Sequence, residues 1–176
     1  DVWVQRLRDF VSAADQRGIV VELTLFCPFY DDSLWKVSPM NPANHIQGVG
    51  NLDTCFRADN DLLPYQKALA RKCAEELRDS KNVFFEIINE PYQAKLDDAW
   101  QRAIIDEVVR TESDFPNKHR IAINVANGDG RIEVPHPAVS VFQFHYAKPE
   151  AALQNRSPGR VIGDDFGFRH RRLGMA

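Results

Sequence analysis

The segment Val83-Phe84-Phe85-Glu86-Ile87-Ile88-Asn89-Glu90-Pro91-Tyr92 decides the fold that we predict for this chain. It is an apolar strand that runs directly into an Asn-Glu-Pro turn. Pro91 lacks a backbone N–H group and ends the pairing of the strand. Glu90 therefore stands at the end of a buried strand, where a carboxylate without partners is costly. Because α/β barrels hold their catalytic groups at this end of their strands, the segment indicates a functional carboxyl group at the mouth of such a fold.

The rest of the chain is predicted to alternate between helices and strands. The stretch 27–60 is rich in Pro, Asn, Asp and Gly, which indicates a long, irregular and functional loop. From the apolar periodicity we expect helices at 1–17, 61–79, 96–112 and 150–155 and strands at 19–26, 83–88, 121–125, 139–145 and 161–162. The alternation predicts right-handed parallel βαβ units. Trp3 and Trp100 are predicted to lie in the core, on the inner faces of their helices.

The number of predicted strands indicates an incomplete barrel. The 176 residues are enough for a hydrophobic core, and we expect a single domain over 1–176. About five strands are predicted, whereas a closed barrel of this class has eight. The fold class is therefore α/β, either an open sheet or a TIM-barrel-like fold truncated to about five parallel strands. Because such a remnant has bare strand edges, we expect either a homodimer or other homo-oligomer that completes the barrel, or a piece of a longer polypeptide.

The composition argues against several classes of protein. The net charge of −3 argues against nucleic-acid binding, and no apolar run reaches the roughly 18 residues that span a membrane. The three cysteines and five histidines lack disulfide or metal-site spacing, so we expect free thiols, no metal and no organic cofactor. The sequence contains neither the Gly-x-Ser-x-Gly elbow of an esterase nor the Gly-x-Gly-x-x-Gly turn of a dinucleotide-binding enzyme.

Polar side chains gather at the strand ends where a parallel sheet forms its ligand crevice. They are Asn89 and Glu90, Asn124 and Asn127, His145 and Tyr146, and Asp164 and Asp165. Carboxylates, amides, an imidazole and a phenol at one rim suit an oxygen-rich substrate such as a sugar. Two carboxyl groups that flank one bond are what glycoside hydrolysis needs, since one protonates the leaving oxygen and the other attacks the anomeric carbon or activates water.

Three of these regions resemble strand motifs of the clan A glycoside hydrolases, the cellulase-like retaining (β/α)8 enzymes. Phe85–Pro91 resembles the fourth-strand motif, in which Asn precedes the catalytic acid/base Glu. Phe144–Tyr146 resembles the sixth-strand His-x-Tyr region, shortened here to His-Tyr, and Val161–Gly167 resembles a seventh-strand segment that usually reads Gly-Glu-Phe-Gly. Leu25–Tyr30, together with Ser38–Asn41, is similar to an uncharacterised cellulase-like bacterial branch. The resemblance covers the third to seventh βα units of that fold.

The resemblance implies a hydrolase of β-linked glycans, an oligosaccharide or polysaccharide, with Glu90 as the acid/base and Asp165 as the nucleophile or base. Asp164 is the reserve for the second role. The family's nucleophile is Glu, and Asp is one methylene shorter, which withdraws the carboxylate by about an ångström. Three outcomes stay open: the backbone advances to compensate, the wider gap holds a water and the reaction inverts, or the chain is a carbohydrate-binding remnant with little activity.

The same resemblance and the strand-end positions imply contacts with the substrate. Asn89 is expected to bind a sugar 2-hydroxyl group, and His145 and Tyr146 are expected to position the sugar. Asp164, beside the second carboxylate, is expected to contact the substrate if it is not the nucleophile.

Two further sets of residues have alternative interpretations. Trp35 either stacks on a sugar face or pins its loop to the core, and the same alternatives hold for Phe29 and Tyr30. Glu86 precedes Glu90 by four residues and faces the same side of a regular strand, so we expect an internal-layer or salt-bridge residue there.

Overall fold

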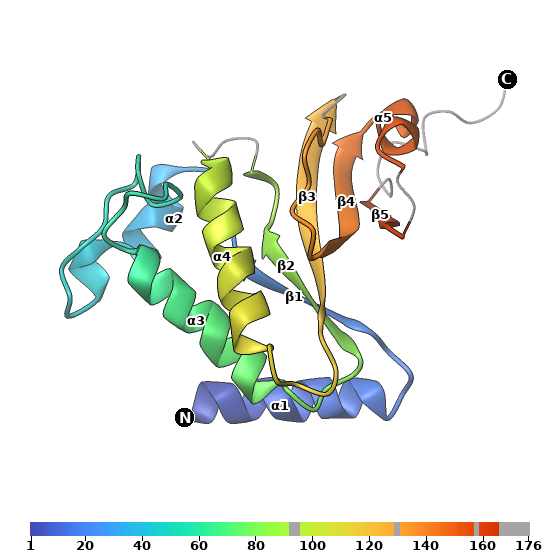
Figure 1. Cartoon of the computed structure of the whole chain (residues 1–176). Helices are drawn as coiled ribbons and strands as arrows, with labels where there is room; N and C mark the ends of the chain where they lie inside the picture. The colour runs from blue at the N-terminus through green and yellow to red at the C-terminus, as the bar shows by residue number, and fades with distance from the viewer. Residues whose placement is uncertain (92–95, 129–130, 157–158, 166–176) are drawn as a thin grey trace, which may run out of the picture.

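The computed structural model of the chain describes residues 1–91, 96–128, 131–156 and 159–165, with the backbone alone at 125–128, 146–147 and 163–165. The elements, shown in Figure 1, are α1 (Val2–Asp15), β1 (Val21–Phe26), α2 (Asp32–Val37), η1 (Pro42–Asn44), α3 (Leu63–Glu76), β2 (Val83–Ile88), α4 (Asp98–Thr111), β3 (Arg120–Gly128), β4 (Val139–Ala147), α5 (Pro149–Gln154) and β5 (Val161–Asp165). All the helices and strands expected from the sequence are present, in the predicted order.

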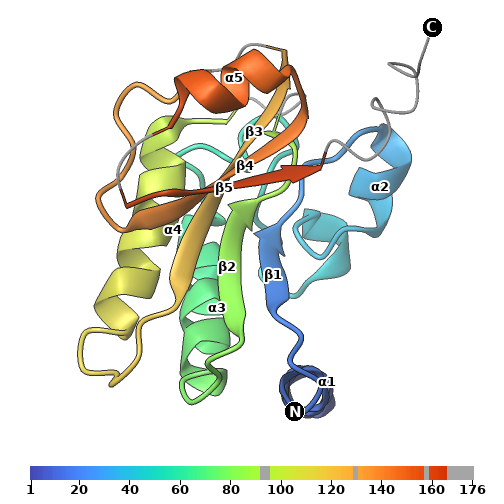
Figure 2. The same ribbon diagram turned by 90° about the vertical axis from the view of Figure 1, so that its right-hand side faces the viewer.

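The five strands form one sheet in the order β1-β2-β3-β4-β5, and every neighbouring pair is parallel. This confirms the predicted α/β class with a five-stranded parallel sheet. Because each strand lies beside the next one along the chain, right-handed crossovers bring their helices to the same face of the sheet. Figure 2 shows the result: α3 and α4 lie behind β1, β2 and β3, and the opposite face of these strands is turned toward the viewer.

The face that α3 and α4 cover is apolar and closed. Strand residues at alternate positions, such as Phe85 and Ile87 in β2, point to this face and are fully buried. The two helices bury against them Ala70, Cys73, Ala74, Leu77, Trp100, Ile104, Ile105 and Val108. Trp100 was predicted to lie in the core, and the prediction is confirmed. Its ring packs edge-to-face against Phe26 and Phe56, with centroids 5.3 and 5.1 Å away.

Four predictions about local structure were wrong. Trp3 is 51% exposed, because α1 buries the stripe that contains Val4, Val11 and Ala14. The loop at 27–60 was expected to be irregular but contains α2 and η1. Their first turns are capped by the side chains of Asp31 and Asn41, which accept hydrogen bonds from backbone N–H groups.

The strand predicted at 19–26 was expected to be covered on both faces. It begins only at Val21, and Glu22 and Thr24 are exposed on the face away from the helices. The strand predicted at 161–162 extends to Asp165, so that Asp164 and Asp165 lie within β5 rather than after it.

Candidate active site

The Asn-Glu-Pro turn lies where β2 ends, beside the end of β1. The backbone N–H of Asn89 donates to the carbonyl of Phe26, the last residue of β1, over 3.0 Å. Glu90 has φ +39°, and it is the only non-glycine residue with positive φ in the part of the chain that the structure describes. For an L-residue this left-handed conformation costs about 1–2 kcal/mol, and strain of this kind is concentrated at functional sites.

The carboxylate of Glu90 is held by partners from two other segments. His145 Nδ1, in β4, lies 3.0 Å from Glu90 Oε1. The hydroxyl of Tyr30, which follows β1, lies 3.4 Å from Glu90 Oε2. The side chains of Glu90 and His145 are 14% and 18% exposed, so the pair is largely buried but open to solvent on one side. A substrate oxygen can therefore reach the carboxyl group.

Tyr30 also contacts two of its neighbours at the rim. The Asn89 amide Nδ2 donates to the Tyr30 hydroxyl oxygen over 3.1 Å, and Cys27 Sγ lies 3.6 Å from the same oxygen. Burial raises the pKa of Tyr30, and the contact with the Cys27 thiol acts in the same direction. The phenol therefore keeps its proton at neutral pH and can donate it in a hydrogen bond.

A layer of polar side chains lies on the same face of the sheet, below the rim. The buried carboxylate of Glu86 accepts hydrogen bonds from Thr24 Oγ1 at 2.8 Å and from Asn124 Nδ2 at 2.9 Å. This is the internal position expected for Glu86. Asn124, a strand-end candidate in the sequence, lies inside β3 and belongs to this layer rather than to the rim. Asn127 is also within β3, and its side chain lies outside the described residues.

Glu22 and Gln143 extend this layer across the sheet, from β1 to β4. Gln143 Nε2 donates to Glu22 Oε1 over 2.8 Å. Although Glu22 as a whole is exposed, partial burial of its carboxyl group raises its pKa, and the negative charge of Glu86 adds to this effect. The hydrogen bond from Gln143 and, to a smaller extent, the nearby His145 lower the pKa of Glu22 and so oppose this rise.

The structure brings Asn89, Glu90 and His145 together and places the other predicted site residues as follows. Asp164 and Asp165 pair through their backbones with Phe144 and His145, so β5 runs beside the strand that carries His145. Tyr146 is in β4. The side chains of Tyr146, Asp164 and Asp165 lie outside the described residues.

The contacts of Trp35 agree with the expectation that it pins its loop to the core, and stacking on a sugar face stays a prediction. Trp35 lies in α2, where its ring packs edge-to-face against Phe29 with centroids 5.0 Å apart. Phe29 in turn stacks on Phe56, at 6.1 Å, and Phe56 contacts Trp100. This row of rings ties α2 to the core.

Sequence reasoning missed Tyr30 as a partner of Glu90. The signal was present, since β1 and β2 were both predicted as parallel strands adjacent along the chain. Residues that follow two such neighbouring strands meet at one edge of the sheet, as Tyr30 and Glu90 do.

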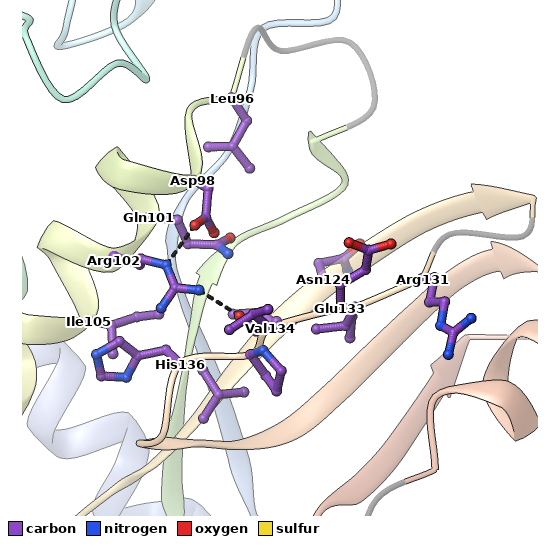
Figure 3. Close-up of a pocket in the computed structure, with 14 residues that line it drawn as sticks. Leu96, Asp98, Gln101, Arg102, Ile105, Asn124, Arg131, Glu133, Val134 and His136 are labelled. Carbon is purple, nitrogen blue, oxygen red and sulfur yellow. Dashed lines mark hydrogen bonds and ion pairs between the residues drawn. The ribbon is translucent and has the colours of Figure 1, made fainter.

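A separate cleft of about 490 Å³ opens on the other side of the sheet, between α4, β3 and residues 131–136. Parallel strands are usually joined through a helix, but the described part of the β3–β4 connection, 131–138, contains none. Figure 3 shows Arg102 of α4 between Asp98 and Val134, whose carboxylate and carbonyl it bonds. Tyr30, Glu90 and His145 do not line this cleft, whereas Asn124 of the polar layer does.

The described residues include no group of three or more His, Cys, Asp or Glu side chains placed to hold a metal ion. Within the same residues, no helix is long and apolar enough to cross a membrane. The chain matches no protein-family model, and no curated protein is significantly similar to it. The chemistry of the site is therefore argued from its own residues.

Proposed function

We propose that this protein is a glycoside hydrolase that cleaves β-linked glycans, with Glu90 as the acid/base. The observation that carries the proposal is the state of Glu90: a partly buried carboxyl group on a strained backbone, bonded to His145 and Tyr30 at the carboxyl edge of a parallel sheet. This edge is where α/β folds bind ligands. The resemblance of Phe85–Pro91, Phe144–Tyr146 and Val161–Gly167 to the clan A motifs adds to this support.

In the proposed reaction, Glu90 protonates the leaving glycosidic oxygen, and Asp165 attacks the anomeric carbon or activates a water. Support for Asp165 comes from the pairing of its backbone with His145, the residue that contacts Glu90. Asp164 is the alternative for the second carboxylate. No metal or organic cofactor is required for this chemistry.

Substrate contacts are proposed for the polar groups around Glu90. The Asn89 amide has two N–H groups; one is bonded to Tyr30, and the other is available in this proposal to a sugar 2-hydroxyl group. His145 and Tyr146 position the sugar. Because the ring of Trp35 packs against Phe29, a role for it in stacking on sugar is limited to its exposed part.

The test is hydrolysis of chromogenic β-glycosides and soluble β-glucans by the wild type, Glu90→Gln and Asp165→Asn. Loss of general acid–base catalysis typically costs 10²–10⁴-fold, so we expect kcat/KM to fall by about that factor in Glu90→Gln. Glu75→Gln, at an exposed position of α3, is the matched control and should keep wild-type turnover. Wild-type turnover by Glu90→Gln on every active substrate would show that the assignment is wrong.

The second candidate is a carbohydrate-binding remnant of the same fold, and the Asp at position 165 favours it because a Glu is expected there. This candidate predicts binding of β-glucan oligosaccharides, measured by calorimetry, with no hydrolysis by the wild type.

We further propose that the sheet is part of a barrel completed by a second copy of the chain. The sequential strand order and the helices on one face agree with a barrel segment. Within the described residues, β1 and β5 each pair on one side only, and such edges favour association. Sedimentation velocity over a dilution series should show a homodimer. A monomer at all concentrations would refute this assembly and leave the alternative that the chain is a piece of a longer polypeptide.

A further inference from the structure

The hydrogen bonds around Tyr30 have a defined direction. An amide nitrogen carries only donors, so the Tyr30 hydroxyl oxygen accepts from Asn89 Nδ2. Cys27 Sγ lies 3.6 Å from the same oxygen. The Tyr30 hydroxyl group donates to Glu90 Oε2 over 3.4 Å. Because burial raises the pKa of Tyr30, the hydroxyl proton stays in place at neutral pH.

Tyr30 is held rigidly between two anchored neighbours. Phe29, before it, packs between the rings of Trp35 and Phe56. Asp31, after it, caps α2 by accepting hydrogen bonds from the backbone N–H groups of Ser33 and Leu34. With both flanking residues tied to the fold, the phenol has little freedom to follow a carboxylate that moves.

We propose that Tyr30 is a positioning residue, whose hydroxyl group orients the Glu90 carboxylate and sets the pH range in which Glu90 donates a proton. Tyr30 holds Oε2 while His145 holds Oε1, so the plane of the carboxyl group is fixed at both oxygens. This inference rests on the proposed role of Glu90. A hydrogen bond donated to a carboxylate favours its ionised form, so it opposes the protonated state that a general acid needs.

Among the described residues, titratable groups near Glu90 come from four strands, β1, β2, β4 and β5, and from the segment that follows β1. His145 contacts it from β4, and Tyr30 and Cys27 follow β1. Glu22 and Glu86 lie in the polar layer below, and the backbone of Asp165 pairs with His145 from β5. Replacement of Tyr30 by Phe removes the donor to Glu90 and, with it, the oxygen that Asn89 Nδ2 and Cys27 Sγ contact.

The experiment compares the pH dependence of kcat/KM for the wild type, Tyr30→Phe and the control Tyr65→Phe, whose phenol is on α3. Without the donor, protonated Glu90 persists to higher pH, so the alkaline limb of Tyr30→Phe should move up by about 0.5–1 pH unit. The Tyr65→Phe profile should match the wild type. A purely structural role of Tyr30 would lower kcat without moving this limb.

A second measurement does not depend on turnover. The carboxyl carbon of Glu90 is followed by 13C NMR, with its signal assigned by its absence in Glu90→Gln. In Tyr30→Phe this signal should change at higher pH than in the wild type. If Tyr30→Phe does not fold, 3-fluorotyrosine at position 30, a stronger donor, should move both readouts to lower pH.

The outcomes separate the two proposals. An NMR shift in a protein that hydrolyses no glycan would refute the proposed function and support the role of Tyr30 in holding the carboxylate. Hydrolysis by the wild type, with the alkaline limb and the NMR signal both unchanged in the Tyr30 variants, would overturn the inference and leave the proposed function intact.

Discussion

The two faces of the parallel sheet are built from the same strands and differ in almost every physical property. In β2, Phe85 and Ile87 point to the helices and are fully buried in the apolar core. Their neighbours Phe84 and Glu86 point to the other face, which Figure 2 shows in front of α3 and α4. There, Glu86 is bonded to polar side chains from β1 and β3. One strand thus serves packing with one set of alternate residues and polar chemistry with the other.

Stability and function are separated between these two faces of the sheet. On the helix face, burial of large apolar side chains stabilises the fold by about 1.5–3 kcal/mol for each side chain. On the polar face, hydrogen bonds contribute about 1 kcal/mol each, and a buried carboxylate carries a desolvation cost. Stability is therefore concentrated on the helix face, and changes on the other face can alter chemistry without unfolding the protein.

The sharpest test of the contrast uses two adjacent residues of the same type. Phe85→Ala removes a fully buried ring from the core, and we expect the free energy of unfolding to fall by about 3–5 kcal/mol. Phe84→Ala removes a partly exposed ring from the polar face, and the expected loss is about 1–2 kcal/mol. Denaturant unfolding followed by circular dichroism measures both. Equal losses would show that the two faces are equally packed in solution, for example because a partner covers the polar face.

The sequence predicted the helix face well, because apolar residues at most of its buried positions leave a periodic signal. The strand Val83–Ile88 and the burial of Trp100 follow from that signal. Trp3 shows its limit: α1 carries apolar residues on more than one side, and only the packing of the helix decides which stripe is buried. The sequence also marked Glu90 and His145, since polar residues at strand ends are exceptions to the apolar pattern.

The partners of these residues were harder to predict, because they depend on the path of a loop rather than on periodicity. Tyr30 reaches Glu90 from a segment 60 residues earlier, and its position depends on the packing of Phe29 and the cap at Asp31. Likewise, Asn124 looked like a rim residue because the end of β3 was placed too early. The longer strand moves Asn124 into the sheet, where it meets Glu86.

Replacement of Glu86 should change the free energy of unfolding by less than Phe85→Ala does. The residue that replaces it decides whether this free energy rises or falls. The carboxylate is 2% exposed and has two neutral donors but no cationic partner among the described residues. Glu86→Gln removes the buried charge. Without any other change, its amide oxygen can accept from Asn124 Nδ2 and its amide nitrogen can donate to Thr24 Oγ1. We expect Gln to raise the free energy of unfolding by about 1 kcal/mol.

Glu86→Ala should have the opposite effect, because it leaves the Thr24 hydroxyl and the Asn124 amide without an acceptor. The expected loss is about 1–3 kcal/mol in the free energy of unfolding, measured by the same denaturant titration. Together, the two variants show whether the protein requires the negative charge of Glu86. If Glu86→Gln stabilises the protein and hydrolysis by Glu90 is retained, neither the fold nor the reaction requires the negative charge of Glu86. If Gln destabilises as Ala does, the negative charge itself is required, and a cation or a substrate group must face it in the assembled protein.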